Sequence, residues 1–236
     1  MAHAFSVSVW ILLLSVSNIA FAHHGRDFLL VQSAHIPESG DAYVIARQDY
    51  LDRGDGRETE LEPGAVAGVT DWLTMELHGH AAKEEGEPMR YESTGAVAYV
   101  RWTPREARWS IGTSVEYVDA ADNELHDEVA AAMLTTYEAS DWIFAMNLDA
   151  THERDSSEDD SWGIRGAVRR SFKRSVAFGV EFVGSFDHRE DREVMFGAYL
   201  HPMHPLTINL GVGTGFDGGP DYTLRSALIW QISTGD

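Results

Sequence analysis

Alternation of apolar and polar residues over long stretches is the feature that most constrains what this sequence can fold into. In residues 175–200, every second residue of two runs is apolar, and a charged loop at 188–192 separates the runs. A period of two is typical of β-strands, so this stretch predicts two strands joined as a hairpin. The apolar face would either line the core of a water-soluble β-sandwich or barrel, or face lipid around a membrane barrel.

Strand lengths and connections distinguish these two alternatives. Strands of soluble proteins usually have about five or six residues, whereas a tilted strand that crosses a bilayer needs about 9–11. Tight turns alternate along the chain with longer polar or acidic connections, as they do in outer-membrane barrels. We therefore expect an all-β, antiparallel, up-and-down transmembrane barrel of about twelve strands, with both termini on one side. The expected strands lie at roughly 41–52, 58–69, 72–82, 90–102, 108–118, 124–137, 141–152, 161–170, 175–187, 192–201, 205–215 and 221–232.

The N-terminus has the features of an export signal. Residues 5–21 are mostly apolar and lead into Ala20-Phe21-Ala22, an A-x-A cleavage pattern, with a membrane anchor as the alternative interpretation. We expect residues 1–22 to be a cleaved signal peptide, 23–40 a lead-in segment that packs in or under the barrel, and 41–236 the barrel. Export and the barrel pattern together predict the outer membrane of a Gram-negative bacterium.

Aromatic residues recur near the ends of the expected strands. Membrane barrels carry such residues in girdles at both membrane–water interfaces, where an amphipathic ring is favoured. The residues concerned are Trp72, Trp102, Trp109, Tyr137, Trp142, Trp162, Tyr222 and Trp230.

Several short segments resemble a known family. The sequence is similar to the small outer-membrane barrels grouped as the meta-pathway phenol-degradation (MetA-like), transporter-like family, and the likeness covers most of the chain after residue 22. The resemblance implies a porin-like transport barrel for small solutes, including hydrophobic or aromatic ones, and it carries over no catalytic residue. The segments that carry it are Ala22-His23-His24-Gly25-Arg26-Asp27-Phe28-Leu29-Leu30-Val31-Gln32, Glu60-Leu61-Glu62-Pro63-Gly64, Gly211-Val212-Gly213-Thr214-Gly215 and Gly219-Pro220-Asp221-Tyr222-Thr223-Leu224-Arg225.

Net charge and motif content argue against several functions. A formal net charge of −20 argues against general affinity for nucleic acid. The chain has no cysteine, which excludes thiolate metal sites and cysteine nucleophiles. No G-x-S-x-G elbow, P-loop or zinc-protease helix pattern is present, so we expect neither an enzyme nor a cofactor. The expected partners are outer-membrane lipid and lipopolysaccharide, the barrel-assembly machinery, a small solute, and divalent cations held weakly at acidic loops such as 153–160.

Charged residues on the less apolar strand faces are candidates for lining a lumen. They would either pair in a static, plugged interior or line a water path, and the sequence leaves both open. We expect Arg165, Arg169 and Arg225 to be matched by acids on adjacent strands, because an unpaired charge in a narrow lumen is costly. The candidates are Arg47, Glu60, Glu62, Glu76, Arg101, Glu116, Glu128, Asp149, Arg165, Arg169, Glu181 and Arg225.

The two interpretations of the lumen correspond to two functions. The first is a passive channel or transporter-like barrel for small solutes. The second is a non-conducting structural or surface-interaction barrel that acts through its acidic loops.

Two histidine motifs are candidate metal ligands. His78 and His80 alternate on one expected strand with Glu76 on the same face, so both imidazoles could bind a metal with a third ligand from a neighbouring strand. Polar residues at a lumen rim are the alternative. His23 would begin the mature chain, and its amine and imidazole nitrogens together suit Cu(II).

Overall fold

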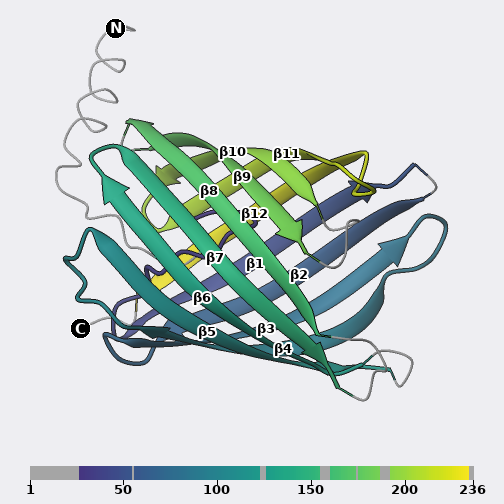
Figure 1. Cartoon of the computed structure of the whole chain (residues 1–236), viewed down its shortest axis with the longest axis horizontal. Helices are drawn as coiled ribbons and strands as arrows, with labels where there is room; N and C mark the ends of the chain where they lie inside the picture. Colours follow the sequence, from purple (N-terminus) through teal and green to yellow (C-terminus); the bar gives the residue numbers. More distant parts are fainter. Residues whose placement is uncertain are drawn as a thin grey trace, which may run out of the picture.

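Twelve antiparallel β-strands close into a barrel in the computed structural model, which describes residues 27–54, 56–122, 126–154, 160–173, 175–186 and 192–233 (Figure 1). Each strand pairs with its neighbours in sequence, and β1 pairs with β12 to complete the ring. The predicted fold class is confirmed. The strands are β1 (Asp41–Asp52), β2 (Arg57–Gly68), β3 (Leu73–Glu84), β4 (Arg90–Arg101), β5 (Trp109–Ala120), β6 (Glu128–Ala139), β7 (Trp142–Glu153), β8 (Ser161–Lys173), β9 (Val176–Ser185), β10 (Glu193–Met203), β11 (Leu206–Gly215) and β12 (Tyr222–Ser233).

The hairpin predicted around residues 175–200 is formed by β9 and β10. Phe182 lies opposite Val194 and Phe178 lies opposite Ala198, so the apolar residues of both strands share one face. That face points outward, because Phe178 is 51% exposed whereas Glu181 on the opposite face is fully buried. A register slip of one residue would exchange the two faces, so the alternation itself fixes the pairing.

The two ends of the barrel differ in their connections. At the end where β1 begins and β12 finishes, which we call the terminal end, the connections are 69–72, 102–108, 140–141, 174–175 and 204–205. At the opposite end, the loop end, they are 53–56, 85–89, 121–127, 154–160, 186–192 and 216–221, and they include the acidic segments. The described residues contain no helix that is long and apolar enough to cross a membrane. The expected signal peptide and His23 lie outside the described residues.

A belt of apolar side chains covers the outside of the barrel wall. Phe196 and Leu77, for example, are 62% and 61% exposed although both lie within strands. Exposed aromatic residues stand near both ends of the belt, with Trp72, Trp102 and Trp109 at the terminal end and Tyr222 at the loop end. Such an exterior is unfavourable in water and is suited to hydrocarbon between two interfaces.

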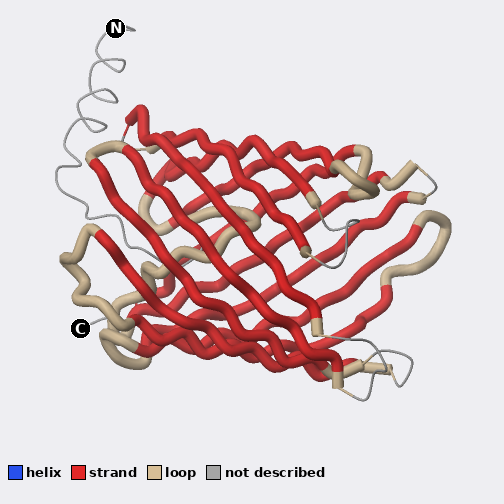
Figure 2. Tube along the Cα trace, viewed as in Figure 1, coloured by secondary structure: helices blue, strands red, loops and turns tan. Residues whose placement is uncertain are grey.

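Residues 27–40, which we call the plug, run inside the barrel and belong to no strand (Figures 1 and 2). The plug returns to the terminal end, where the N–H of Gly40 donates to the carbonyl of Gly68 (2.9 Å) just before β1 begins. Its apolar side chains fill the space between the walls. Those that are buried are Phe28, Leu29, Val31, Ala34 and Ile36.

We predict that an outward charge is tolerated at the rim of the wall but not at its middle. Leu210, 45% exposed, lies near the centre of β11, whereas Met203, 59% exposed, ends β10. In a bilayer, Leu210→Arg should lower the free energy of unfolding by about 2–4 kcal/mol, and Met203→Arg by about 0–1 kcal/mol. Urea unfolding in lipid vesicles measures both, and equal small losses would contradict a lipid-facing belt.

Candidate functional site

One buried carboxylate holds the backbone of the plug. Glu181 on β9 is fully buried, and its two oxygens accept the N–H groups of Leu29 (2.8 Å), Leu30 (2.6 Å) and Val31 (3.1 Å). The hydroxyl of Tyr199 on β10 donates to the same carboxylate (2.5 Å). Hydrogen bonds to a carboxylate are stronger than neutral ones, so four donors on one group fix three consecutive plug residues against the wall.

A second anchor joins the start of the plug to β8. The guanidinium of Arg169 donates to the backbone carbonyl of Asp27 (2.7 Å) and to its carboxylate (3.0 Å). The same group lies over the rings of Phe28 and Tyr199, 5.4 and 5.3 Å from their centroids. The expectation that an adjacent strand supplies the acid for Arg169 is therefore wrong, because the acid comes from the plug.

The part of the plug that follows Val31 is held by residues on several strands of the wall. The amide of Asn147 on β7 donates to the carbonyl of Gln32 (3.1 Å), and Ser114 on β5 donates to the Gln32 side chain (3.2 Å). Thr136 on β6 accepts the N–H of Ala34 (2.8 Å). Irregular backbone away from water needs such partners, and here side chains of the wall provide them.

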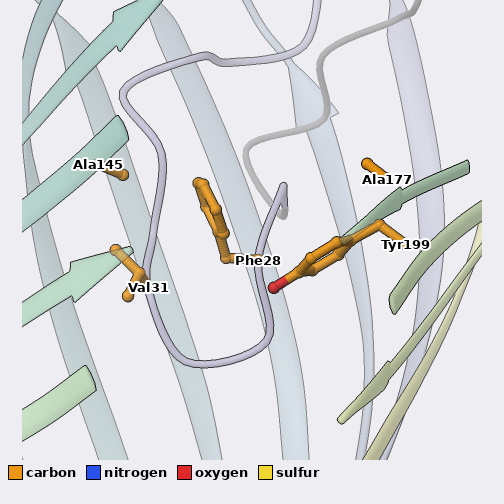
Figure 3. Packing of buried hydrophobic residues seen from close by; sticks show 5 residues of the cluster. All are labelled: Phe28, Val31, Ala145, Ala177 and Tyr199. Atoms are coloured by element: carbon orange, nitrogen blue, oxygen red, sulfur yellow. The ribbon is translucent and has the colours of Figure 1, made fainter. Parts of the chain in front are cut away.

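Apolar side chains also pack between the plug and the wall. Figure 3 shows Phe28 and Val31 on the plug between Ala145 of β7 and Ala177 and Tyr199 of β9 and β10. The rings of Phe28 and Tyr199 meet edge to face, with centroids 5.9 Å apart. The plug thus combines a small apolar core with hydrogen bonds to the wall.

A glycine in β11 makes room for the plug. A β-carbon at Gly211 would lie 2.6 Å from Cδ1 of Leu29 and 2.4 Å from Sδ of Met195, closer than real contacts allow. Any side chain at this position would require the side chains of Leu29 and Met195 to shift.

A cavity of about 320 Å³ lies on the loop side of the plug. It extends from Arg53 and Pro220 at the loop end to Leu29 and Leu30 of the plug. Among the lining residues, the polar and charged ones are Gln32, Arg47, Arg53, Asp149, Thr151, Ser161, Arg165, Ser185, Glu193 and Arg225, and the larger apolar ones are Leu29, Leu30, Leu51, Trp162 and Val183.

Arg165 and Arg225, two of the arginines that line the cavity, are paired with acids. Arg225 on β12 contacts Asp49 on adjacent β1, and its other nitrogen lies 3.0 Å from Glu193 on β10. Arg165 lies 3.2 Å from Asp149 on adjacent β7. Pairing with adjacent strands is therefore confirmed for Arg165 and for the Arg225–Asp49 contact. Charges of both signs face the cavity, so it suits a polar or amphiphilic molecule better than a pure hydrocarbon.

The candidate residues from the sequence separate into groups in space. Arg169 and Glu181 hold the plug, and Arg47, Asp149, Arg165 and Arg225 line the cavity. A third group surrounds two histidines of β3 and consists of Glu60, Glu62, Glu76 and Glu116. Arg101 donates to the Pro104 carbonyl near the terminal end, and Glu128 begins β6 at the loop end, so neither joins a group.

The histidine motif is arranged differently from the expected pair. His78 and His80 share the inner face of β3 with Glu76, but the ligand-type atoms that converge are those of Glu62, Glu76 and His78. His80 instead lies between Glu60 (3.8 Å) and Glu92 (3.2 Å).

The acidic connections are partly outside the described residues. This applies to most of the 153–160 segment, for which weak cation binding stays a prediction. Asp127, just before β6, is described: its carboxylate accepts the N–H of Ala120 (3.1 Å) and the hydroxyl of Tyr117 (2.9 Å). These hydrogen bonds lower the pKa of Asp127, and the one from the backbone of Ala120 has the largest effect. The ionised Asp127 carboxylate therefore stabilises this loop at neutral pH, and the stabilisation is lost as the pH falls through the lowered pKa of Asp127.

Comparison with solved structures places the fold among bacterial outer-membrane channels. The COG4313 outer membrane channel from Pseudomonas putida F1 matches with a TM-score of 0.62 at 14% identity, over 82% of this chain and 96% of that one. The KdgM porin matches with a TM-score of 0.59 at 10% identity, over 80% and 98%. KdgM in complex with disordered oligogalacturonate gives 0.59 at 11% identity, over 82% and 99%. Identities this low establish the fold alone.

Searches by sequence alone give no comparable relation. No protein-family model matches the chain, and no curated protein matches it. The similarity to the phenol-degradation family therefore stays a prediction from short segments of the sequence.

Some residues of the site had no recognisable signal in the sequence. Tyr199 and Asn147 on the wall and Gln32 on the plug make contacts that hold the plug, but none stands in a charged or repeated motif. For Arg169, the observed register places Ile143 and Gly179 opposite it, and neither is an acid.

We predict that the plug is released when its central carboxylate is removed. Glu181→Gln replaces an acceptor of four hydrogen bonds with an amide whose NH₂ group cannot accept them, which should destabilise the docked plug by about 1–3 kcal/mol. Hydrogen exchange of the amides of Leu29, Leu30 and Val31 should accelerate, while exchange in the strands stays slow. Glu128→Gln is the matched control, because Glu128 lies at the loop end of β6. Unchanged exchange in Glu181→Gln would contradict this role.

Proposed function

We propose that this chain is an outer-membrane channel for small solutes whose lumen is closed by the plug. The observation that supports the proposal is the course of the cavity, which extends from the loop end and stops at Leu29 and Leu30. These residues belong to a segment without strand structure, which can move while the wall stays intact. Undocking of the plug would join the cavity to the terminal end of the lumen.

The lining of the cavity suggests the class of solute. Its wall presents both signs of charge together with Leu51 and Val183. The family resemblance points to hydrophobic or aromatic solutes, and the lining favours those that also carry a polar or charged group. The oligogalacturonate in one KdgM structure is a ligand of that porin and of a different chemistry from a simple aromatic compound.

The proposed location and orientation of the barrel in the membrane follow from its apolar belt and its two different ends. The apolar belt would lie in the lipid of the outer membrane of a Gram-negative bacterium after export and insertion by the barrel-assembly machinery. Both termini would face the periplasm, and the acidic loop end would face anionic lipopolysaccharide, where divalent cations can bridge like charges.

The second candidate is a non-conducting barrel that acts through its acidic loops. The observation in its favour is the density of contacts that hold the plug, including the four hydrogen bonds to Glu181. In this case the plug is a permanent part of the interior.

Conductance in a planar lipid bilayer separates the two functions. For a gated channel, the unmodified chain should show infrequent openings, and Glu181→Gln should raise the open probability several-fold, while Glu128→Gln should not. Absence of openings in all three proteins, together with no solute uptake into liposomes, would reject the channel in favour of the non-conducting barrel.

A further inference from the structure

Three side chains with metal-ligand chemistry converge on the inner wall beside the cavity. They are Glu62 on β2 and Glu76 and His78 on β3, and one ligand-type atom of each lies within 4.8 Å of the other two. Glu76 and His78 are two residues apart and share the inner face of β3. Glu62 joins them because Gly64, two residues further along β2, pairs with His78. We propose that this trio binds one divalent transition-metal cation, for which Zn²⁺ is the probe.

The imidazole of His78 supplies an observation independent of the acids. Its side chain is 10% exposed, and Nδ1 has no hydrogen-bond partner among the described residues. Nδ1 points to the carboxylate of Glu76, whose Oε1 is 3.7 Å away. That distance is too long for a hydrogen bond. A buried ring nitrogen that has no hydrogen-bond partner and lies close to a carboxylate is the arrangement that a bound cation would complete.

Glu116 on β5 fixes which nitrogen of His78 is available. Its carboxylate lies 3.2 Å from Nε2 of the ring. Metal-binding histidines almost always donate their other ring N–H to a carboxylate or carbonyl, which sets the tautomer and the orientation of the ring. A proton on Nε2 leaves the lone pair on Nδ1, the atom that faces Glu76.

The wall also holds the ring in place sterically. A β-carbon at Gly95 on β4 would lie 2.1 Å from Nε2 of His78 and 2.4 Å from Cε1. The imidazole therefore lies directly against the backbone of Gly95. Only glycine at this position permits the observed orientation.

The charges around the trio favour a cation. The Glu76 side chain is almost fully buried, and Glu62 and Glu116 add two further carboxylates around the same imidazole. Arg47 lies 3.0 Å from Glu62 and offsets one of these charges. Tyr99 donates to Glu76 (2.8 Å) and orients it. Carboxylates crowded in a partly dry site repel one another, and a divalent ion removes that repulsion.

The ligand set indicates the class of metal. Ca²⁺ and Mg²⁺ prefer all-oxygen sites, whereas one imidazole with two carboxylates suits Zn²⁺ and neighbouring transition metals. Three protein ligands leave a coordination position for water.

The site lies where the wall is locally weak. Between the Leu61–Ala81 and Gly64–His78 pairs, neither Glu62 nor Pro63 has a ladder partner in β3. Pro63 has no N–H to donate. An ion held by Glu62 from one strand and by Glu76 and His78 from the other would cross-link β2 and β3 at this gap. This role is independent of whether the lumen conducts.

Calorimetric titration of the folded, tag-free chain in detergent with Zn²⁺ tests the proposal. We expect one saturable site, and a melting temperature that rises with Zn²⁺ and falls back with a chelator. The titration is repeated in a His23→Ala, His24→Ala background, because the amino-terminal histidines are the other candidate ligands.

Point variants test whether the bound Zn²⁺ ion is held by the trio. His78→Asn and Glu76→Gln should abolish the saturable site and the Zn²⁺-dependent rise in melting temperature. Glu116→Gln should weaken binding by roughly 10–100-fold, as loss of a partner behind a ligand does. Gly95→Ala should also weaken binding by displacing the ring. His80→Asn is the matched control, because His80 stands two residues away on the same face and also lies between two glutamates.

Two outcomes would overturn the proposal. The first is no saturable binding of Zn²⁺ to the unmodified chain, which would leave His78 as a protonated bridge between Glu76 and Glu116. The second is binding that survives His78→Asn but disappears in His80→Asn or in the amino-terminal background. Circular dichroism and the gel-mobility shift on heating verify that each variant is folded, and Glu76→Gln provides a second test should His78→Asn fail to fold.

Discussion

Closure of the ring between β1 and β12 is the constraint on which the rest of this structure depends. The two strands pair from Asp41–Ser233 to Asp52–Tyr222, so the sheet has no open edge. Apart from the gap between β2 and β3 at Glu62 and Pro63, backbone groups of neighbouring strands pair within the wall, which allows the outer face to be apolar. Closure also creates an interior, and every charge placed there must find a partner there.

The interior meets this requirement in two ways, one in each half of the barrel. Toward the terminal end, polar wall residues such as Glu181, Thr136 and Asn147 bond to the irregular backbone of the plug. Toward the loop end, charged residues bond to one another across neighbouring strands, as Arg225 does with Asp49. The half toward the terminal end is filled by the plug, and the half toward the loop end keeps a cavity. The wall therefore carries hydrogen-bonding side chains where it faces the plug and ion pairs where it faces the cavity.

The sequence allowed the wall to be predicted because each strand carries its own signal. A period of two sustained over ten or more residues, as in β9 and β10, specifies a strand and its outward face at once. The plug has no such period, and its partners on the wall lie far away in the sequence, as Ser114 does from Gln32 (82 residues) and Thr136 from Ala34 (102 residues). Packing of this segment in or under the barrel was expected, but its hydrogen bonds to Glu181, the partner of Arg169 and the participation of Glu62 in the histidine cluster depend on three-dimensional closure, which no local pattern encodes.

The long separation between the plug and its partners also sets an order of events in folding. Leu29 bonds to Glu181, a separation of 152 residues, and Arg169 reaches back to Asp27. The surface that receives the plug does not exist until β5 to β10 have assembled, since all six strands contribute to it. The part of the described chain that is synthesised first is therefore the part that acquires its structure last. Until then its leucines and phenylalanine stay uncovered, and this segment has to remain unfolded without aggregating while the wall forms around its future position.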